Sequence, residues 1–148
     1  MQTWEATNPD FARTVREAVL SMPAARHLGF GFGAITPGHV EIVQPHRPEL
    51  TQHNGFLQGG VLGSLADFAA GSAAGTLLQP GWVNMTIDYT VKILAPAKGA
   101  TVLARGRVVN PGALLTVAAA DVFSVDPGGE ILCATALVTM RNVKLAKS

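Results

Sequence analysis

One carboxylate, Asp67, stands in the middle of the most apolar stretch of the chain, residues 55–78. Burying an isolated carboxylate is costly, so such a residue is normally paired, protonated or kept for a function. In the alternative interpretation, Asp67 lies at a solvated gap or a subunit interface and only accepts hydrogen bonds there. The residues around Asp67 leave both interpretations open.

Gln58, Gly59 and Gly60 open the helix that this stretch predicts, directly after a polar loop at 46–55. Glycines let a ligand approach the backbone closely. The N–H groups of a first helical turn lack partners within the helix and carry the positive end of its dipole. Such a helix start can stabilise a developing oxyanion. The small residues later in the helix are interpreted as positions of close packing against a sheet.

These two candidate groups are too far apart to act together within one chain. Asp67 follows the helix start by seven to nine residues, which corresponds to ~10–14 Å along a helix axis. If two such helices pack antiparallel about a two-fold axis, Asp67 of one chain faces the helix start of the other. The geometry therefore predicts a dimer with two identical composite sites.

The elements that position these groups follow from the hydrophobic pattern and the turn residues. Asn8 is expected to cap a short helix at 9–21, and Pro23 to end it. The apolar stretch predicts a helix at 58–78, and a frayed tail is expected at 144–148. Strands are predicted at 28–36, 39–44, 84–93, 101–109, 114–124 and 131–141.

The strand at 84–93 has the clearest period-two pattern. Its odd-numbered residues from Met85 to Ile93 are apolar, and polar residues alternate with them. We expect these apolar side chains to share one face of a half-buried strand.

The long helix is apolar nearly all round, so it must be covered on nearly all sides. We expect a single α+β domain over residues 1–148, in which a curved antiparallel sheet of about six strands wraps the helix. Charged residues make up only 14% of the chain, against roughly 25% in an average soluble domain. This deficit predicts a buried subunit interface, in a homodimer that pairs again into a dimer of dimers.

Composition excludes several classes of function. A net charge of +1 argues against a broad basic surface for nucleic acid or a membrane. A single cysteine, Cys133, excludes a disulfide framework within the chain and a cysteine-rich metal site. The first residues do not form a signal peptide, so a cytoplasmic location is expected. A membrane-spanning helix at 55–78 is disfavoured because Asp67 interrupts it.

Two segments resemble a known family. QHNGFLQGGVLGSLADFAAGSAAG at 52–75 is similar to the central-helix signature of hotdog-fold acyl-CoA thioesterases, in particular the phenylacetate-degradation (PaaI-like) group. TIDYTVKILAPAKG at 86–99 is similar to the next strand and turn of that group. The resemblance implies a hotdog fold and hydrolysis of an acyl-CoA to CoA and a carboxylic acid, with no metal or redox cofactor.

The resemblance also implies catalytic roles for four residues. Asp67 matches the carboxylate that acts as nucleophile, or as general base towards water, from the subunit opposite the bound thioester. Gly59 matches the glycine whose backbone N–H polarises the thioester carbonyl, and Thr86 the hydroxyl residue that positions the water or the carboxylate. Gln58 replaces the histidine that is common before the glycine pair; its amide can donate a hydrogen bond but cannot titrate.

Substrate binding is expected from the loop before the helix and from the helix start. Gln52 takes the position of the family's asparagine, with His53 and Asn54 beside it and Gly60 following Gly59. Because these residues depart from the family pattern, a non-catalytic acyl-CoA-binding module is kept as an alternative. A hydratase or dehydratase would need a catalytic histidine, for which His53 is the nearby substitute. A structural interaction domain is the third alternative, which the lone aspartate in the helix disfavours.

Overall fold

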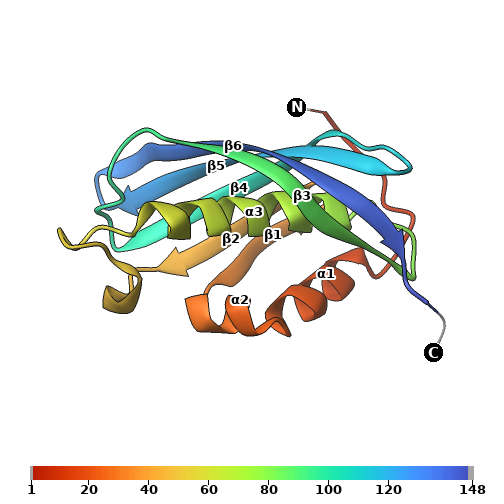
Figure 1. Cartoon of the computed structure of the whole chain (residues 1–148), viewed down its shortest axis with the longest axis horizontal. Coiled ribbons are helices and arrows are strands. Elements are labelled where there is room, and N and C mark those ends of the chain that lie inside the picture. The colour runs from red at the N-terminus through yellow and green to blue at the C-terminus, as the bar shows by residue number, and fades with distance from the viewer. Residues whose placement is uncertain (1, 147–148) are drawn as a thin grey trace.

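A curved antiparallel sheet wraps one long helix, α3 (Gly59–Gly75), in the computed structural model, which describes residues 2–146 (Figure 1). The sheet has six strands in the order β1-β2-β4-β5-β6-β3. Their bounds are β1 (Gly31–Thr36), β2 (His39–Pro45), β3 (Trp82–Ile93), β4 (Thr101–Asn110), β5 (Leu115–Asp126) and β6 (Gly129–Lys144). The predicted α+β hotdog fold and its single central helix are confirmed.

The region before the sheet forms two helices where one was predicted. These are α1 (Phe11–Leu20) and α2 (Pro23–Leu28). Pro23 begins the second helix, because a first-turn residue needs no N–H donor. α2 ends at Gly29, whose φ of 80° is left-handed. For this reason the strand predicted from residue 28 begins only at Gly31.

Other element ends also differ from expectation. Asn8 does not cap α1: its Oδ1 accepts from the Asp10 N–H at 2.9 Å, and the helix begins after Asp10 without a side-chain cap. The predicted loop contains a short 3₁₀ helix, η1 (Pro48–Leu50). Lys144, predicted to lie in a frayed tail, belongs to β6, and residues 147 and 148 lie outside the described part.

Small residues let the sheet approach α3 closely, as predicted. A Cβ added to Gly106 of β4 would lie 2.2 Å from the carbonyl oxygen of Ala69, so β4 can come this near to α3 only with glycine there. The helix side of this contact is fully buried, at Leu65, Ala66, Ala69, Ala70 and Ala73. Among residues 2–146, no helix is long and apolar enough to cross a bilayer.

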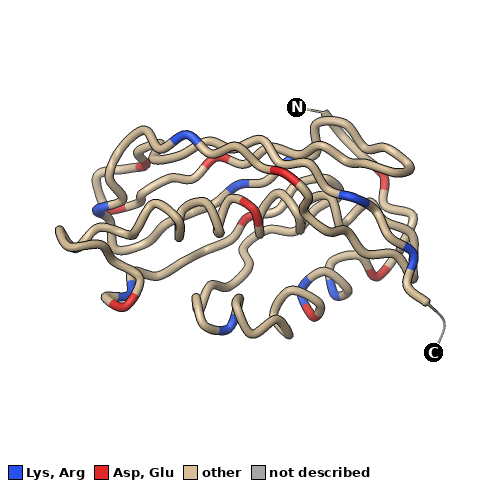
Figure 2. The backbone as a smooth tube through the Cα atoms, viewed as in Figure 1, with Lys and Arg blue, Asp and Glu red and all other residues tan. Residues whose placement is uncertain are grey.

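Charged side chains pair with one another on the face of the sheet turned away from α3. Arg105 lies 3.0 Å from Glu41 and 2.7 Å from Glu130, and Arg107 lies 3.3 Å from Asp121. Basic and acidic positions are interspersed over the fold (Figure 2). These two arginines are therefore already engaged by carboxylates of the chain itself.

β3 is an edge strand with a break in its alternation. It pairs only with β6, and its register shifts between Thr86 and Asp88, so Ile87 is the extra residue of a β-bulge. Thr86 lies opposite Met140 and Tyr89 lies opposite Val138, both buried partners. The face towards α3 thus changes from even-numbered to odd-numbered residues at the bulge.

This break corrects the prediction that the odd-numbered residues of β3 share one half-buried face. In the single chain the strand is largely exposed, with Met85 60% and Ile87 58% accessible. An edge strand that exposes large apolar side chains is a surface suited to pairing with another chain.

Candidate active site

Every fourth residue of α3 lies on one helix face, and this face is turned towards β3. The five residues of the face are Gly59, Gly63, Asp67, Gly71 and Gly75. The carbonyl oxygen of Gly71 accepts from Asn84 Nδ2 at 2.9 Å. A Cβ added to Gly63 would lie 3.6 Å from Tyr89 and from Val91. Asp67 is therefore the central residue, and the one carboxylate, of a face made otherwise of glycine.

Thr86 of β3 holds the Asp67 carboxylate. Its Oγ1 donates to Asp67 Oδ1 at 2.7 Å. Burial raises the pKa of Asp67 above its ordinary value, and the hydrogen bond from Thr86 offsets part of this rise. Desolvation disfavours the charged form and so makes the carboxylate a stronger base. The pair combines an oriented carboxylate with a raised proton affinity.

The β-bulge is what turns Thr86 towards Asp67. Beyond the bulge, Tyr89 and Val91 face α3, and unbroken alternation from them would direct residue 86 to the opposite face. The extra residue Ile87 reverses that alternation. Bulges are known to redirect side chains next to functional sites. The resemblance implies a role for Thr86, but no glycine or proline in the strand marks the bulge.

The start of α3 carries free backbone donors. Gln58 is the N-cap residue, and its Oε1 accepts from the Val61 N–H at 3.2 Å. The N–H groups of Gly59 and Gly60 donate to no acceptor among residues 2–146. Because the Gln58 cap uses its oxygen, its Nε2 is the end that can donate to a ligand. The helix start can thus offer donors to one oxygen of a bound molecule.

A cleft of about 450 Å³ lies in front of this helix start. Gln52, Asn54 and Gly59 line it together, opposite Ile93 and the turn that follows β3. Of the other predicted binding residues, His53 and Gly60 are exposed and do not line this cleft. Two of the four predicted substrate-binding residues, Gln52 and Asn54, therefore line this cleft.

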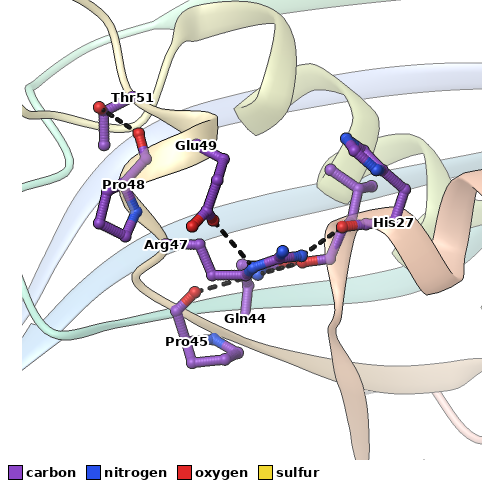
Figure 3. Close-up of polar contacts among 8 residues, drawn as sticks. His27, Gln44, Pro45, Arg47, Pro48, Glu49 and Thr51 are labelled. Atoms are coloured by element: carbon purple, nitrogen blue, oxygen red, sulfur yellow. Dashed lines mark hydrogen bonds and ion pairs between the residues drawn. The ribbon is translucent and has the colours of Figure 1, made fainter.

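The segment before this cleft is fixed by polar contacts to the end of α2 (Figure 3). The buried Gln44 donates through Nε2 to the carbonyl oxygens of Leu28, at 2.7 Å, and Pro45, at 3.0 Å. Arg47 donates to the carbonyl oxygen of His27 and lies 3.2 Å from Glu49. These contacts hold the path from β2 to α3 on which the cleft residues lie.

Asp67 and Thr86 line a different cleft, of about 380 Å³, between α1 and β3. No residue lines both clefts. Gly59 and Asp67 are eight residues apart on α3, or about 12 Å along its axis. Within one chain, the donors at the helix start and the Asp67 carboxylate therefore serve separate clefts. No group of histidine, cysteine, aspartate or glutamate that could hold a metal ion occurs in residues 2–146.

Comparisons with known proteins place this geometry in a family. The family model of the thioesterase superfamily matches residues 54–131, a range that contains Gly59, Asp67 and Thr86. A thioesterase family protein from Silicibacter pomeroyi is 34% identical, with a TM-score of 0.88 over 90% of this chain and 98% of that chain.

Two further solved structures are similar. A phenylacetic acid degradation-related protein from Ralstonia eutropha JMP134 is 25% identical, with a TM-score of 0.75 over 88% of this chain and 98% of that chain. A thioesterase from Haemophilus influenzae, at 23% identity, shares the fold, with a TM-score of 0.80 over 99% of this chain and 95% of that chain. The chain belongs to the thioesterase superfamily, as a thioesterase with the hotdog fold.

Proposed function

We propose that this thioesterase hydrolyses an acyl-CoA to CoA and a carboxylic acid, in composite sites built by two copies of the chain. One observation carries the proposal: Gly59, with its free N–H, and Asp67, held by Thr86, lie on one face of α3 but line separate clefts. One cleft contains the backbone donors for the oxyanion and the other contains the carboxylate, and thioester hydrolysis needs both. A two-fold dimer supplies each cleft with the groups that it lacks.

The edge strand supports such a dimer. Met85, Ile87 and Ile93 expose large apolar side chains on β3, and the chain has few charges, 14% of its residues. Pairing of two copies along β3 covers these side chains and sets the two α3 helices antiparallel. Asp67 then faces the helix start of the partner. A further pairing into a dimer of dimers is part of the same proposal.

The chemistry follows from the groups in each composite site. The Gly59 N–H, with the Gln58 amide beside it, donates to the thioester carbonyl oxygen and stabilises the oxyanion that develops there. Asp67 of the other copy takes a proton from water as the water oxygen bonds to the carbonyl carbon. Collapse of this intermediate breaks the carbon–sulfur bond, and CoA leaves as a thiolate that takes up the proton. In the direct alternative, Asp67 itself attacks the carbonyl carbon and the carbon–sulfur bond breaks; water then hydrolyses the mixed anhydride to the carboxylic acid and restores Asp67, and the released proton goes to the CoA thiolate.

A mixing experiment tests the composite site. Asp67→Asn removes the charge, and Gly59→Pro removes the N–H donor at a first helical position, where proline is tolerated. Gly59→Ala is the matched control, because it keeps the N–H and its Cβ meets nothing nearer than Ile93 at 3.9 Å. Each test variant alone is expected to lose turnover of a panel of acyl-CoAs, followed with a thiol reagent.

Co-refolding the two inactive variants in equal amounts distinguishes the arrangements. With a composite site, half of the dimers are mixed and each mixed dimer contains one native site, so about a quarter of wild-type activity returns. With a site inside one chain, every site carries a substitution and no activity returns. That second result refutes the composite site.

The same panel of acyl-CoAs distinguishes the alternative functions from hydrolysis. Saturable binding of acyl-CoA without release of thiol identifies a binding module. A hydratase or dehydratase needs a histidine near the carboxylate, whereas neither cleft has one among its described lining residues, and His53 is exposed. No observation therefore favours that activity.

A further inference from the structure

The cleft that contains Asp67 continues away from the reacting groups as a long apolar channel. Along α3 it runs from Asp67 past Gly71 to Gly75, and Leu78 lines it in the turn after the helix. Val15 lies beside Gly75, where a Cβ would come within 3.3 Å of it. Figure 1 shows that α1 runs in the direction opposite to α3, and residues of both helices line this cleft.

The length of this cleft can be taken from each of its three walls. It spans residues 67–75 of α3 and 14–22 on the α1 side, eight residues each, or about 12 Å at ~1.5 Å per residue. On β3 it spans residues 82–86, four residues, or about 13 Å at ~3.3 Å per residue. The three walls agree on a channel of about 12 Å.

We propose that this channel binds the acyl group of the substrate and is built for an unbranched chain of roughly eight to ten carbons. An extended chain covers ~1.2 Å per bond, one third of the ~3.6 Å that a fully extended residue spans, so about 12 Å accommodates about ten bonds. The proposal rests on the proposed function, because the thioester carbonyl must lie beside Asp67 at the open end. An aryl group would fill only the first half of the channel.

The walls have the chemistry for such a chain. α1 contributes Val15, Ala18 and Val19, and Met22 follows between α1 and α2; all four lie outside residues 54–131 that the family model matches. On the α3 wall, Gly71 and Gly75 present no side chain to the channel, between Asp67 and Leu78. Leu78 and Trp82 line the end farthest along α3 from Asp67 and set the limit on chain length.

The test is a series of straight-chain acyl-CoAs from four to sixteen carbons, with phenylacetyl-CoA and benzoyl-CoA, on the wild-type protein. Each methylene buried in an apolar site adds about a factor of four. kcat/KM is therefore expected to rise by about that factor per methylene until roughly eight to ten carbons, and then to level off. A flat series, or a preference for the aryl substrates, overturns the chain-length proposal while the hydrolytic function stands. If no acyl-CoA is hydrolysed, the proposed function itself fails.

Ala18→Leu narrows the channel halfway along α1. Ala18 is exposed, so the larger side chain does not strain the core. The rise in kcat/KM is expected to stop at roughly five or six carbons, about half of the ten bonds that the full channel accommodates. Glu17→Leu is the control, because this neighbouring exposed residue does not line the channel. Its chain-length profile should follow the wild type.

Leu78→Ala is the opposite change, since it opens the far end of the channel. It is expected to move the point at which the series levels off towards longer chains, and it keeps the proposal falsifiable if the Ala18 variant does not fold. Identical profiles for wild type and both channel variants would place the acyl group elsewhere.

Discussion

Replacing Asp67 by asparagine separates catalysis from stability in a single variant. Asparagine keeps the shape of the side chain and an oxygen that can accept from Thr86 Oγ1, now 2.7 Å from Asp67 Oδ1. It removes the charge that can attack a carbonyl carbon or take a proton from water. Catalysis and folding should therefore respond in different directions.

The expected loss of turnover is large. A positioned general base contributes typically ~10²–10⁴-fold, and a nucleophile can contribute more. In free energy of activation this range corresponds to about 2.7–5.4 kcal/mol, at ~1.36 kcal/mol per factor of ten. Binding of substrate should change little, because the acyl channel and the donors at the helix start are left intact.

The expected effect on stability depends on pH. Burial raises the folded-state pKa of Asp67 above its ordinary value of 3.8, so the folded protein holds this proton more tightly than the unfolded chain does. The stability associated with the protonated form is complete below the unfolded pKa and is lost as pH rises through the folded one. Asparagine does not titrate, so the variant should melt at or above the wild-type temperature near pH 7. This advantage should shrink towards pH 4.

The assay combines kcat, acyl-CoA affinity and melting temperature between pH 4 and pH 8. Asp88→Asn is the matched control, since it makes the same chemical change at an exposed position of β3, two residues from Thr86. Turnover of the Asp67 variant within a few-fold of wild type, together with a lower melting temperature at neutral pH, would refute the catalytic role. Asp67 would then be a structural acceptor for Thr86.

Three further outcomes follow from the same geometry. Thr86→Val removes a hydrogen bond that lowers the pKa of Asp67, so the acidic limb of the kcat/KM profile should move to higher pH. Activity should fall by about one to two powers of ten, as for a charge-assisted bond of ~1.5–3 kcal/mol, and an unmoved limb would contradict the coupling. Gln58→His should keep or raise activity; a folded variant that loses ~100-fold, about 2.7 kcal/mol, would give Gln58 a different role. Light scattering at micromolar concentration should detect no stable monomer, and a fully active monomer would rule out the two-chain site.

Much of the site could be predicted from the sequence because a helix has a fixed rise. If the stretch around Asp67 forms one helix, the number of residues between Gly59 and Asp67 gives the distance between them, whatever the helix packs against. The six strands could be predicted from alternating apolar residues and from turn residues, because both are local patterns that involve only a few neighbouring positions.

Features that depend on distant partners could not be predicted in this way. Pro23 can either end a helix or begin one, and only the packing of α2 against the sheet decides between them. The bulge at Ile87 lies in a run of β-formers with no glycine or proline to mark it, and it arises from the pairing of β3 with β6. The wall that α1 contributes to the acyl channel is a contact between segments about fifty residues apart.

The bulge also gives β3 a signature that a systematic substitution scan would detect. Replacing each residue of the strand by a charged one should damage the protein at alternate positions, as on any sheet with one covered face. Here the damaging positions should be 84 and 86, and then 89, 91 and 93. The interval between damaging positions is therefore three residues across the bulge at Ile87 and two residues elsewhere. Deleting Ile87 would remove the extra residue and restore unbroken alternation with residues 84 and 86 still facing α3, so the hydrogen bond from Thr86 to Asp67 should survive and the damaging positions should then alternate without a break.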